Sequence, residues 1–338
     1  MLKQLKATRR ALLVGSSVTA AALMASTAPV TAESVETLFP TPPTTFAIPH
    51  YVAIDKGYYA DQGLEVKDTH LLGDANAFRA LVSGTGDVVL VGPSTTMKGI
   101  QKGAKVKVFS SWQPRVDYQL ITGKNGPKTL GKELVGLKFA SGGGVSMLNH
   151  MAAMILKKNG LDHTKNQHVP IGGHSDRLAA VIAGKAGLSM VNTLTATRAG
   201  DQVNIVTPVA KELGGIGYVY LVARQETLDN PERRAALKKY VKGFVQGARY
   251  AIKDPDYAAA ALQKRSPETK LPLIQKVVRA LNAIPVWGVN GGIPDEVTEF
   301  TAKTYLEYKV LKKAIDPSDV LYKGIVNEVI AEIGTWNG

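Results

Sequence analysis

The sequence contains no cysteine among its 338 residues. Without cysteine the chain cannot form disulfides, use a catalytic thiol or bind zinc through thiolates. A lipid-modified N-terminal cysteine is excluded as well. Any function must therefore rest on other side chains and on the backbone.

Motifs typical of catalytic and metal sites are also missing. The six histidines show no His-Glu-x-x-His spacing, and no Gly-x-Ser-x-Gly or Gly-Lys-Ser/Thr motif occurs. His174-Ser175-Asp176 contains the residue types of a catalytic triad, but adjacent side chains diverge and cannot form that geometry alone. We therefore expect no catalytic residues, no metal and no cofactor.

Dense basic runs are absent, although the net charge is +13. Four of the positive charges lie in the first ten residues, so the charge falls to +9 if this segment is removed. The other Lys and Arg residues are interspersed with acids, which argues against nucleic-acid binding. A moderately basic surface instead favours attraction of anionic solutes.

No stretch approaches the roughly 20 apolar residues that a membrane-spanning helix needs, so the chain is not expected to be membrane-inserted. Residues 1–32 have a basic start, a short apolar core and the small residues Val30-Thr31-Ala32, and we interpret them as a signal peptide. Thr8-Arg9-Arg10 and the following residues resemble a twin-arginine export signal. An exported chain without a lipid anchor is expected in the periplasm of a Gram-negative cell.

Apolar runs of strand length alternate with helical patterns through residues 33–223. Strands are predicted at 35–39, 88–91, 105–109, 188–191 and 218–223, with helices at 48–56, 75–83 and 176–183, and the chain after Asn230-Pro231 is predicted to be helical. Such alternation is typical of parallel, doubly wound α/β sheets, in which ligands bind beyond the carboxyl ends of the strands.

One strand end stands out, because the triple glycine Gly142-Gly143-Gly144 links the strand that starts near Gly136 to a helix. Glycine allows close backbone approach, and the free N–H groups at a helix start favour anions. This turn is either a simple flexible turn or the cradle for a small anion. The spacing matches neither a P-loop nor a dinucleotide fingerprint.

Several motifs occur in an order that resembles a known family. They are Pro42-Pro43-Thr44-Thr45, Lys56-Gly57-Tyr58-Tyr59, Gly63-Leu64-Glu65-Val66, Ser83-Gly84-Thr85-Gly86-Asp87-Val88, Gly136-Leu137-Lys138 with the glycine turn, and Asn230-Pro231. Together they resemble the periplasmic solute-binding proteins of the nitrate/sulfonate/taurine class of ABC importers, which overlap with thiamine-pyrimidine-binding relatives. The resemblance spans nearly the whole chain after residue 32.

The resemblance implies a type II periplasmic-binding fold, with two doubly wound lobes joined by two crossing strands. We expect the first lobe to comprise residues 33–122 and 220–338 and the second to comprise 123–219. The lobes would close around a ligand by bending near residues 119–123 and 217–220.

Positions matching the family's binding loops are the expected ligand contacts. In the first lobe these are Thr44, Thr45, Phe46, Ser94, Thr95 and Trp112, and in the second they are Gly143, Gly144, Val145, Ser146 and Asn192. Four of these residues also have a structural alternative. Ser94 and Thr95 suit helix caps, Trp112 suits core packing, and Asn192 suits a turn.

The resemblance further implies a monomer that delivers a small organic anion, a sulfonate or a carboxylate with an apolar or aromatic body, to an ABC permease and its ATPase. Alternatives are a pyrimidine or thiamine-precursor binding protein, a related pyrimidine-synthesising enzyme, and a sensor subunit. The fungal pyrimidine synthases related to this fold carry a cysteine-rich motif, which this chain lacks.

Overall fold

The computed structural model describes residues 33–141 and 147–338. Residues 1–32, which include the expected signal peptide, lie outside the described part, as do residues 142–146. Within the described part, no helix has both the length and the apolar character needed to cross a bilayer.

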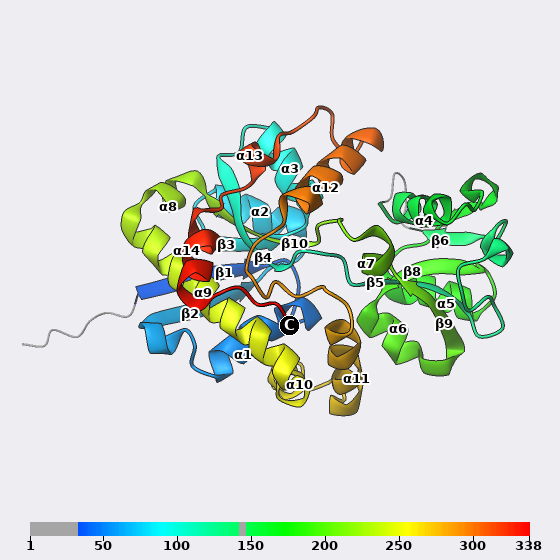
Figure 1. Ribbon diagram of the computed structural model, residues 1–338, viewed down its shortest axis with the longest axis horizontal. Helices are drawn as coiled ribbons and strands as arrows, with labels where there is room; N and C mark the ends of the chain where they lie inside the picture. The colour runs from blue at the N-terminus through cyan, green and yellow to red at the C-terminus, as the bar shows by residue number, and fades with distance from the viewer. Residues whose placement is uncertain (1–32, 142–146) are drawn as a thin grey trace, which may run out of the picture. The chain divides into compact units, whose positions relative to one another are not determined.

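Two five-stranded sheets form the framework (Figure 1). The first sheet has the order β2 (Leu64–His70), β1 (Glu33–Phe39), β3 (Val88–Val91), β10 (Val219–Arg224) and β4 (Val106–Gln113). The second, green in Figure 1, has the order β7 (His168–Pro170), β6 (Phe139–Ser141), β8 (Leu188–Asn192), β5 (Tyr118–Gly123) and β9 (Val203–Pro208). The expected fold class of two doubly wound α/β lobes is confirmed.

Each sheet differs from the all-parallel prediction at one strand. β10 runs antiparallel to both β3 and β4, and β5 runs antiparallel to both β8 and β9. Each of these strands continues from a segment that crosses between the sheets, so it enters its sheet in the opposite direction to its neighbours. Hydrophobic patterns do not reveal strand direction, which is why the sequence did not show it.

The two faces of the first sheet are buried by different helices, because successive side chains of a strand point to opposite faces. On one face, strand side chains such as Phe39 and Leu90 pack with α1 (Ile48–Asp55), α9 (Pro231–Lys253), α10 (Pro255–Gln263), α11 (Leu271–Asn282) and α14 (Gly324–Ile333). On the other face, Leu38 and Val91 pack with α2 (Asp74–Val82), α3 (Pro93–Gln101), α12 (Asp295–Glu307) and α13 (Pro317–Val320). α8 (Gln225–Asp229) leads from β10 into α9.

The second sheet is covered in the same manner. α4 (Met147–Lys158) and α7 (Val209–Leu213) pack on the face that carries Leu120 and Met190. α5 (His174–Ile182) and α6 (Thr193–Ala199) cover the face that carries Ile121 and Val191. Short 3-10 turns at Thr45–Ala47, Ala60–Gln62, Lys132–Leu134, His163–Lys165 and Gly200–Gln202 complete the elements.

The two sheets repeat one arrangement. In the first, β2-α2-β3-α3-β4 follow one another, and in the second, β7-α5-β8-α6-β9 do the same. The equivalent strands occupy the same places in the two sheet orders, with β10 and β5 as the antiparallel members. The equivalent helices are α2, which begins at Asp74, and α5, which begins at His174, so these two residues occupy equivalent first positions.

Residues 114–117 and 214–218 connect the sheets. They run beside each other, since the Val116 amide donates to the Ile216 carbonyl at 3.3 Å and the Arg115 Nε donates to the Gly214 carbonyl at 2.5 Å. Of the predicted bending positions, 119–123 and 219–220 lie inside β5 and β10, where pairing with neighbouring strands holds the backbone, whereas 217–218 lie in the second connecting segment. Any bending between the sheets is therefore expected in the connecting segments.

The lobe boundaries predicted from the sequence lie close to the connecting segments but do not coincide with them. Residues 118–122, assigned from the sequence to the first lobe, pair in the second sheet as part of β5. Val219 pairs in the first sheet. The chain thus changes sheet at 114–117, a few residues before the position expected from the sequence.

Close packing of α1 against α9 gives the first testable prediction. A Cβ atom on Gly247 of α9 would lie 2.1 Å from the Pro49 carbonyl and 3.0 Å from the Ala53 Cβ. Gly247→Ala should therefore lower the free energy of unfolding by about 1–3 kcal/mol, despite the better helix propensity of alanine. Urea denaturation of the two proteins measures the difference.

Gln246→Ala is the matched control, because Gln246 precedes Gly247 in the same helix and is only partly buried. It should change the unfolding free energy by less than about 1 kcal/mol. A Gly247→Ala protein as stable as the parent would contradict the described helix contact.

Candidate functional site

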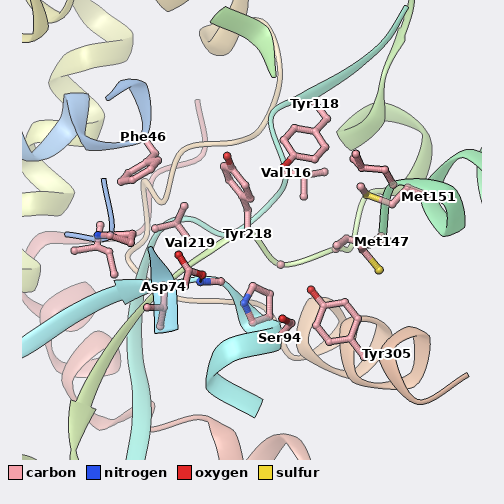
Figure 2. A pocket seen from close by; sticks show the side chains of 18 of the residues that line it. Phe46, Asp74, Ser94, Val116, Tyr118, Met147, Met151, Tyr218, Val219 and Tyr305 are labelled. Atoms are coloured by element: carbon pink, nitrogen blue, oxygen red, sulfur yellow. Dashed lines mark hydrogen bonds between the residues drawn. The ribbon is translucent and has the colours of Figure 1, made fainter. Parts of the chain in front are cut away.

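A cavity of about 300 Å³ lies where the two connecting segments meet the edges of both sheets. Figure 2 shows Asp74, Ser94 and Tyr305 on one side of it, with Val116, Tyr118, Met147 and Met151 on the other. Phe46, Tyr218 and Val219 complete the labelled lining. The volume is at the lower end of the range for small-molecule sites.

Strand ends and helix starts supply most of this lining. Pro40 and Thr41 follow β1, and Gly92, Pro93 and Ser94 join β3 to α3. In doubly wound sheets this edge is where ligands bind, because loops from neighbouring strands converge there. Met147, Leu148 and Met151 from α4 contribute the second lobe's apolar wall.

Tyrosines form much of the remaining wall. Tyr118 begins β5 and Tyr218 directly precedes β10, so each connecting segment carries one tyrosine into the cavity, and the rings meet edge to face with centroids 5.7 Å apart. Tyr305 reaches the same space from α12. Burial raises the pKa of Tyr118 to about 12, so its phenol keeps its proton at physiological pH and is able to donate and to accept hydrogen bonds.

One carboxylate lies in this wall. Asp74 Oδ2 accepts a hydrogen bond from the Gly92 amide at 2.8 Å. Burial raises the pKa of Asp74 above its ordinary value, and the Gly92 amide and the nearby Thr95 hydroxyl oppose the rise. No Lys, Arg or His lines the cavity among residues 33–141 and 147–338.

Two of the predicted first-lobe contacts, Phe46 and Ser94, line the cavity. Thr95 is not part of the lining, but its hydroxyl is near enough to Asp74 to lower the pKa of that carboxyl. Thr44 and Thr45 are not part of the lining. Thr44 is the residue before the 3-10 turn at 45–47, and the Thr45 side chain is buried within the protein. Ser94 and Thr95 do not cap α3, because Gly92 is the N-cap and both residues lie inside the helix.

Trp112 occupies the first lobe's core. It is fully buried, stacks on His50 with centroids 4.7 Å apart and on Phe244 at 5.6 Å, and does not reach the cavity. The structure thus favours the packing alternative over the ligand-stacking role expected from the sequence. Neighbouring strand residues point to opposite faces, and the strand β4 extends through Gln113, so the indole turns inward.

The second-lobe contacts divide in two. Gly143, Gly144, Val145 and Ser146 lie outside the described residues. Asn192 caps α6, where its side chain accepts from the Thr195 amide at 2.9 Å, and its own amide donates to His174 Nδ1 at 3.1 Å. Asn192 therefore has the turn role that was its alternative, and it is not part of the cavity lining.

Asp74, Tyr118, Tyr218 and Tyr305 were missed in the sequence. Gly73-Asp74 follows a strand end, as Gly92-Pro93-Ser94 does, so the same rule could have included Asp74. No local pattern marks Tyr305, which lies in a helix more than 200 residues further along the chain.

A family model described as NMT1/THI5 like matches residues 44–258. The chain belongs to the NMT1/THI5-like family. No curated protein matches the sequence.

Solved structures similar to this NMT1/THI5-like protein share its fold. The periplasmic aliphatic sulphonate binding protein SsuA from Escherichia coli has 17% identity and a TM-score of 0.69, with 86% of this chain and 92% of that chain covered. The periplasmic nitrate-binding protein NrtA from Synechocystis PCC 6803 has 15% identity and a TM-score of 0.63, with 89% of each chain covered. The ligand-binding component of an ABC-type import system from Staphylococcus aureus, solved with zinc bound, has 11% identity and a TM-score of 0.67, with 88% and 99% covered.

These similar structures are mainly binding components of import systems, and the two-lobed fold that the resemblance implied is the one they share with this chain. Identities below 25% support the fold alone. The solute has to be inferred from the cavity of this chain itself.

A buried acid beside the cavity gives the second testable prediction. Asp117 lies between the cavity residues Val116 and Tyr118, is 2% exposed, and has an Oδ1 atom without a hydrogen-bond partner among the described residues. Burial raises its pKa from 3.8 to about 7. An acid whose folded-state pKa is raised binds its proton more tightly in the folded protein, so stability falls as pH rises from about 4 to about 7.

Asp117→Asn removes this titration. The unfolding free energy of the variant, relative to the parent, should rise by about 3 kcal/mol between pH 5 and pH 8. Urea denaturation at several pH values between 5 and 8 measures this change in unfolding free energy. Asp61→Asn is the control, because Asp61 is exposed. A parent-minus-variant difference that does not change with pH would contradict a raised Asp117 pKa.

Proposed function

We propose that the chain is the periplasmic solute-binding subunit of an ABC importer. It captures a small organic solute in the cavity between the two sheets and delivers it to a permease and, through it, to an ATPase. The observation that carries this proposal is the cavity itself, which both sheets and both connecting segments line. The import role is supported by the similar structures, which include a ligand-binding component of an ABC-type import system.

In this proposal residues 1–32 act as the export signal, so the mature chain works in the periplasm. It acts there as a monomer. Its first lobe is built on β1 to β4 and β10, and its second on β5 to β9. Both lobes contribute to the lining, so a solute touching both would favour the closed arrangement, because only differential affinity shifts a population. Bending in residues 114–117 and 214–218 would provide the closure.

The composition of the cavity favours an organic solute over a bare inorganic ion. Phe46, Tyr118, Tyr218 and Tyr305 offer aromatic surfaces, and Met147 and Met151 offer apolar ones. Such walls suit a flat or alkyl body, and a few polar groups fix its orientation. The anionic end proposed for the solute rests on the glycine turn, whose residues lie outside the described part.

The role is binding without catalysis. The similar structures named above are all binding proteins or binding components, and in the described part of the lining no hydroxyl nucleophile is hydrogen-bonded to a histidine or a carboxylate. An enzyme role would require such a pair within hydrogen-bond reach of a substrate.

Filling the cavity tests the proposed function. Ser94 lies on the first turn of α3, half-buried at the cavity wall, so Ser94→Trp places an indole in the binding space without disturbing a core contact. We expect native mass spectrometry of periplasmic protein to find a bound small molecule on the parent and to find it lost from the variant. A solute at 100 times its dissociation constant stabilises the folded parent by about 2.7 kcal/mol, so the variant should also melt lower under such conditions.

Ser83→Trp is the matched control. Ser83 ends α2 on the exposed surface, away from the cavity, and its variant should keep the bound molecule. Retention of the molecule by Ser94→Trp, or a parent that never carries one under any growth condition, would count against the proposal.

A further inference from the structure

We propose that Asp74 selects solutes that carry an N–H donor, an ammonium, amino or ring N–H group, at the end that faces the first lobe. This inference rests on the proposed solute-binding function and narrows the class of solute. It assigns the specificity to one carboxylate in the cavity wall.

The hydrogen bonds of Asp74 leave room for a ligand. An ionised carboxylate offers about four acceptor positions, and in the described part of the chain the geometry gives it one clear donor, the Gly92 amide at 2.8 Å. Because Asp74 lines the cavity, its unused acceptor positions are available to a bound solute (Figure 2).

The charge of Asp74 also lacks a partner. In the described part of the chain Asp74 forms no salt bridge, and the lining contains no basic side chain. Burial is the main cause of the raised pKa of Tyr118, Tyr218 and Tyr305, and the negative charge of Asp74 adds to the rise in all three, so these cavity phenols lie within its electrostatic reach. A partly buried charge without a counter-ion is costly, and a donor on the solute would offset that cost.

A purely structural role does not account for the charge. In the second lobe, His174 occupies the equivalent first position of α5, and its Nδ1 accepts from the Asn192 amide as Asp74 accepts from Gly92. Nδ1 also accepts from Arg177 at 3.0 Å, and burial lowers the pKa of His174 to about 4, so the ring is neutral at physiological pH. A neutral acceptor is thus sufficient to join the helix start to the strand end.

The aromatic surroundings suit the same class of solute. Ammonium groups and polarised N–H groups are attracted to the faces of tyrosine rings as well as to carboxylates. Asp74 together with Tyr218 and Tyr305 offers both kinds of contact from three different elements. A bare anion at this position would meet only repulsion from Asp74.

A matched pair of probes tests the inference. Benzenesulfonate and 4-(aminomethyl)benzenesulfonate share the ring and the sulfonate, and only the second carries an ammonium group. Calorimetry on the full mature chain should show the amino probe binding at least tenfold more tightly. Asp74→Asn should abolish this preference, and Asp61→Asn, which removes an exposed charge away from the cavity, should retain it.

Asp74→His provides a second variant, because it copies the neutral link of the other lobe and so preserves the fold. Thermal melts without probe establish that both variants are folded. Equal binding of the two probes, or a preference that survives both substitutions, would overturn the role of Asp74 while leaving solute binding in place. If neither probe binds the parent, the proposed solute class is wrong, and the bound-molecule measurement on Ser94→Trp remains the separate test of the function.

Discussion

The structure depends on the strand that each sheet receives from a segment crossing between them. β10 inserts between β3 and β4 only after the chain has built the second sheet, and it is hydrogen-bonded on both sides. A central strand without partners would leave buried backbone groups unpaired, so the first sheet cannot be completed without the return of the chain. The two lobes are therefore tied through interior strands of their sheets and not only through surface contacts.

This constraint also builds the site. Because both connecting segments pass between the sheets, the residues that flank them, Tyr118 and Tyr218, are placed over the converging strand ends. The contact of Val116 with Ile216 satisfies backbone groups where no sheet partner exists. The same short segments thus provide the covalent link, the place for bending and part of the cavity wall.

Comparing equivalent positions in the two lobes distinguishes hydrogen bonds that the fold needs from groups that are available to a solute. Both lobes join the first residue of a helix to the amide at the end of the neighbouring strand, through Asp74 in one and His174 in the other. The hydrogen bond that both lobes share has a structural role. The charge differs between the lobes, and at the cavity the first lobe presents the Asp74 carboxylate whereas the second presents a predominantly apolar wall from α4.

Sequence reasoning went furthest where the signal was periodic. The strand at 88–91 and the long helix after Asn230-Pro231 appear as predicted, and the apolar face of that helix, including Val241 and Phe244, is buried. The strand β9 was missed, because Val203–Pro208 is only partly buried and its apolar pattern is therefore weak. Strand direction in β5 and β10 could not be predicted, because it follows from where the chain re-enters a sheet.

The site was predicted less completely for a related reason. Phe46 and Ser94 follow strand ends that a general rule identifies, and both line the cavity. Trp112 also lies at a strand end, but whether it faces the core or the cavity depends on how far β4 continues. Tyr305 comes from a helix distant in sequence, and only the packing of α12 beside α3 brings it to the site.

A crystal structure of the mature chain, purified from the periplasm with its own solute, tests the central claim most directly. The account predicts electron density for a small organic molecule in the cavity, between Tyr118 of β5, Tyr218 of the second connecting segment and Tyr305 of α12, in contact with both lobes. Density bound elsewhere on the chain, or in contact with one lobe only, would contradict it.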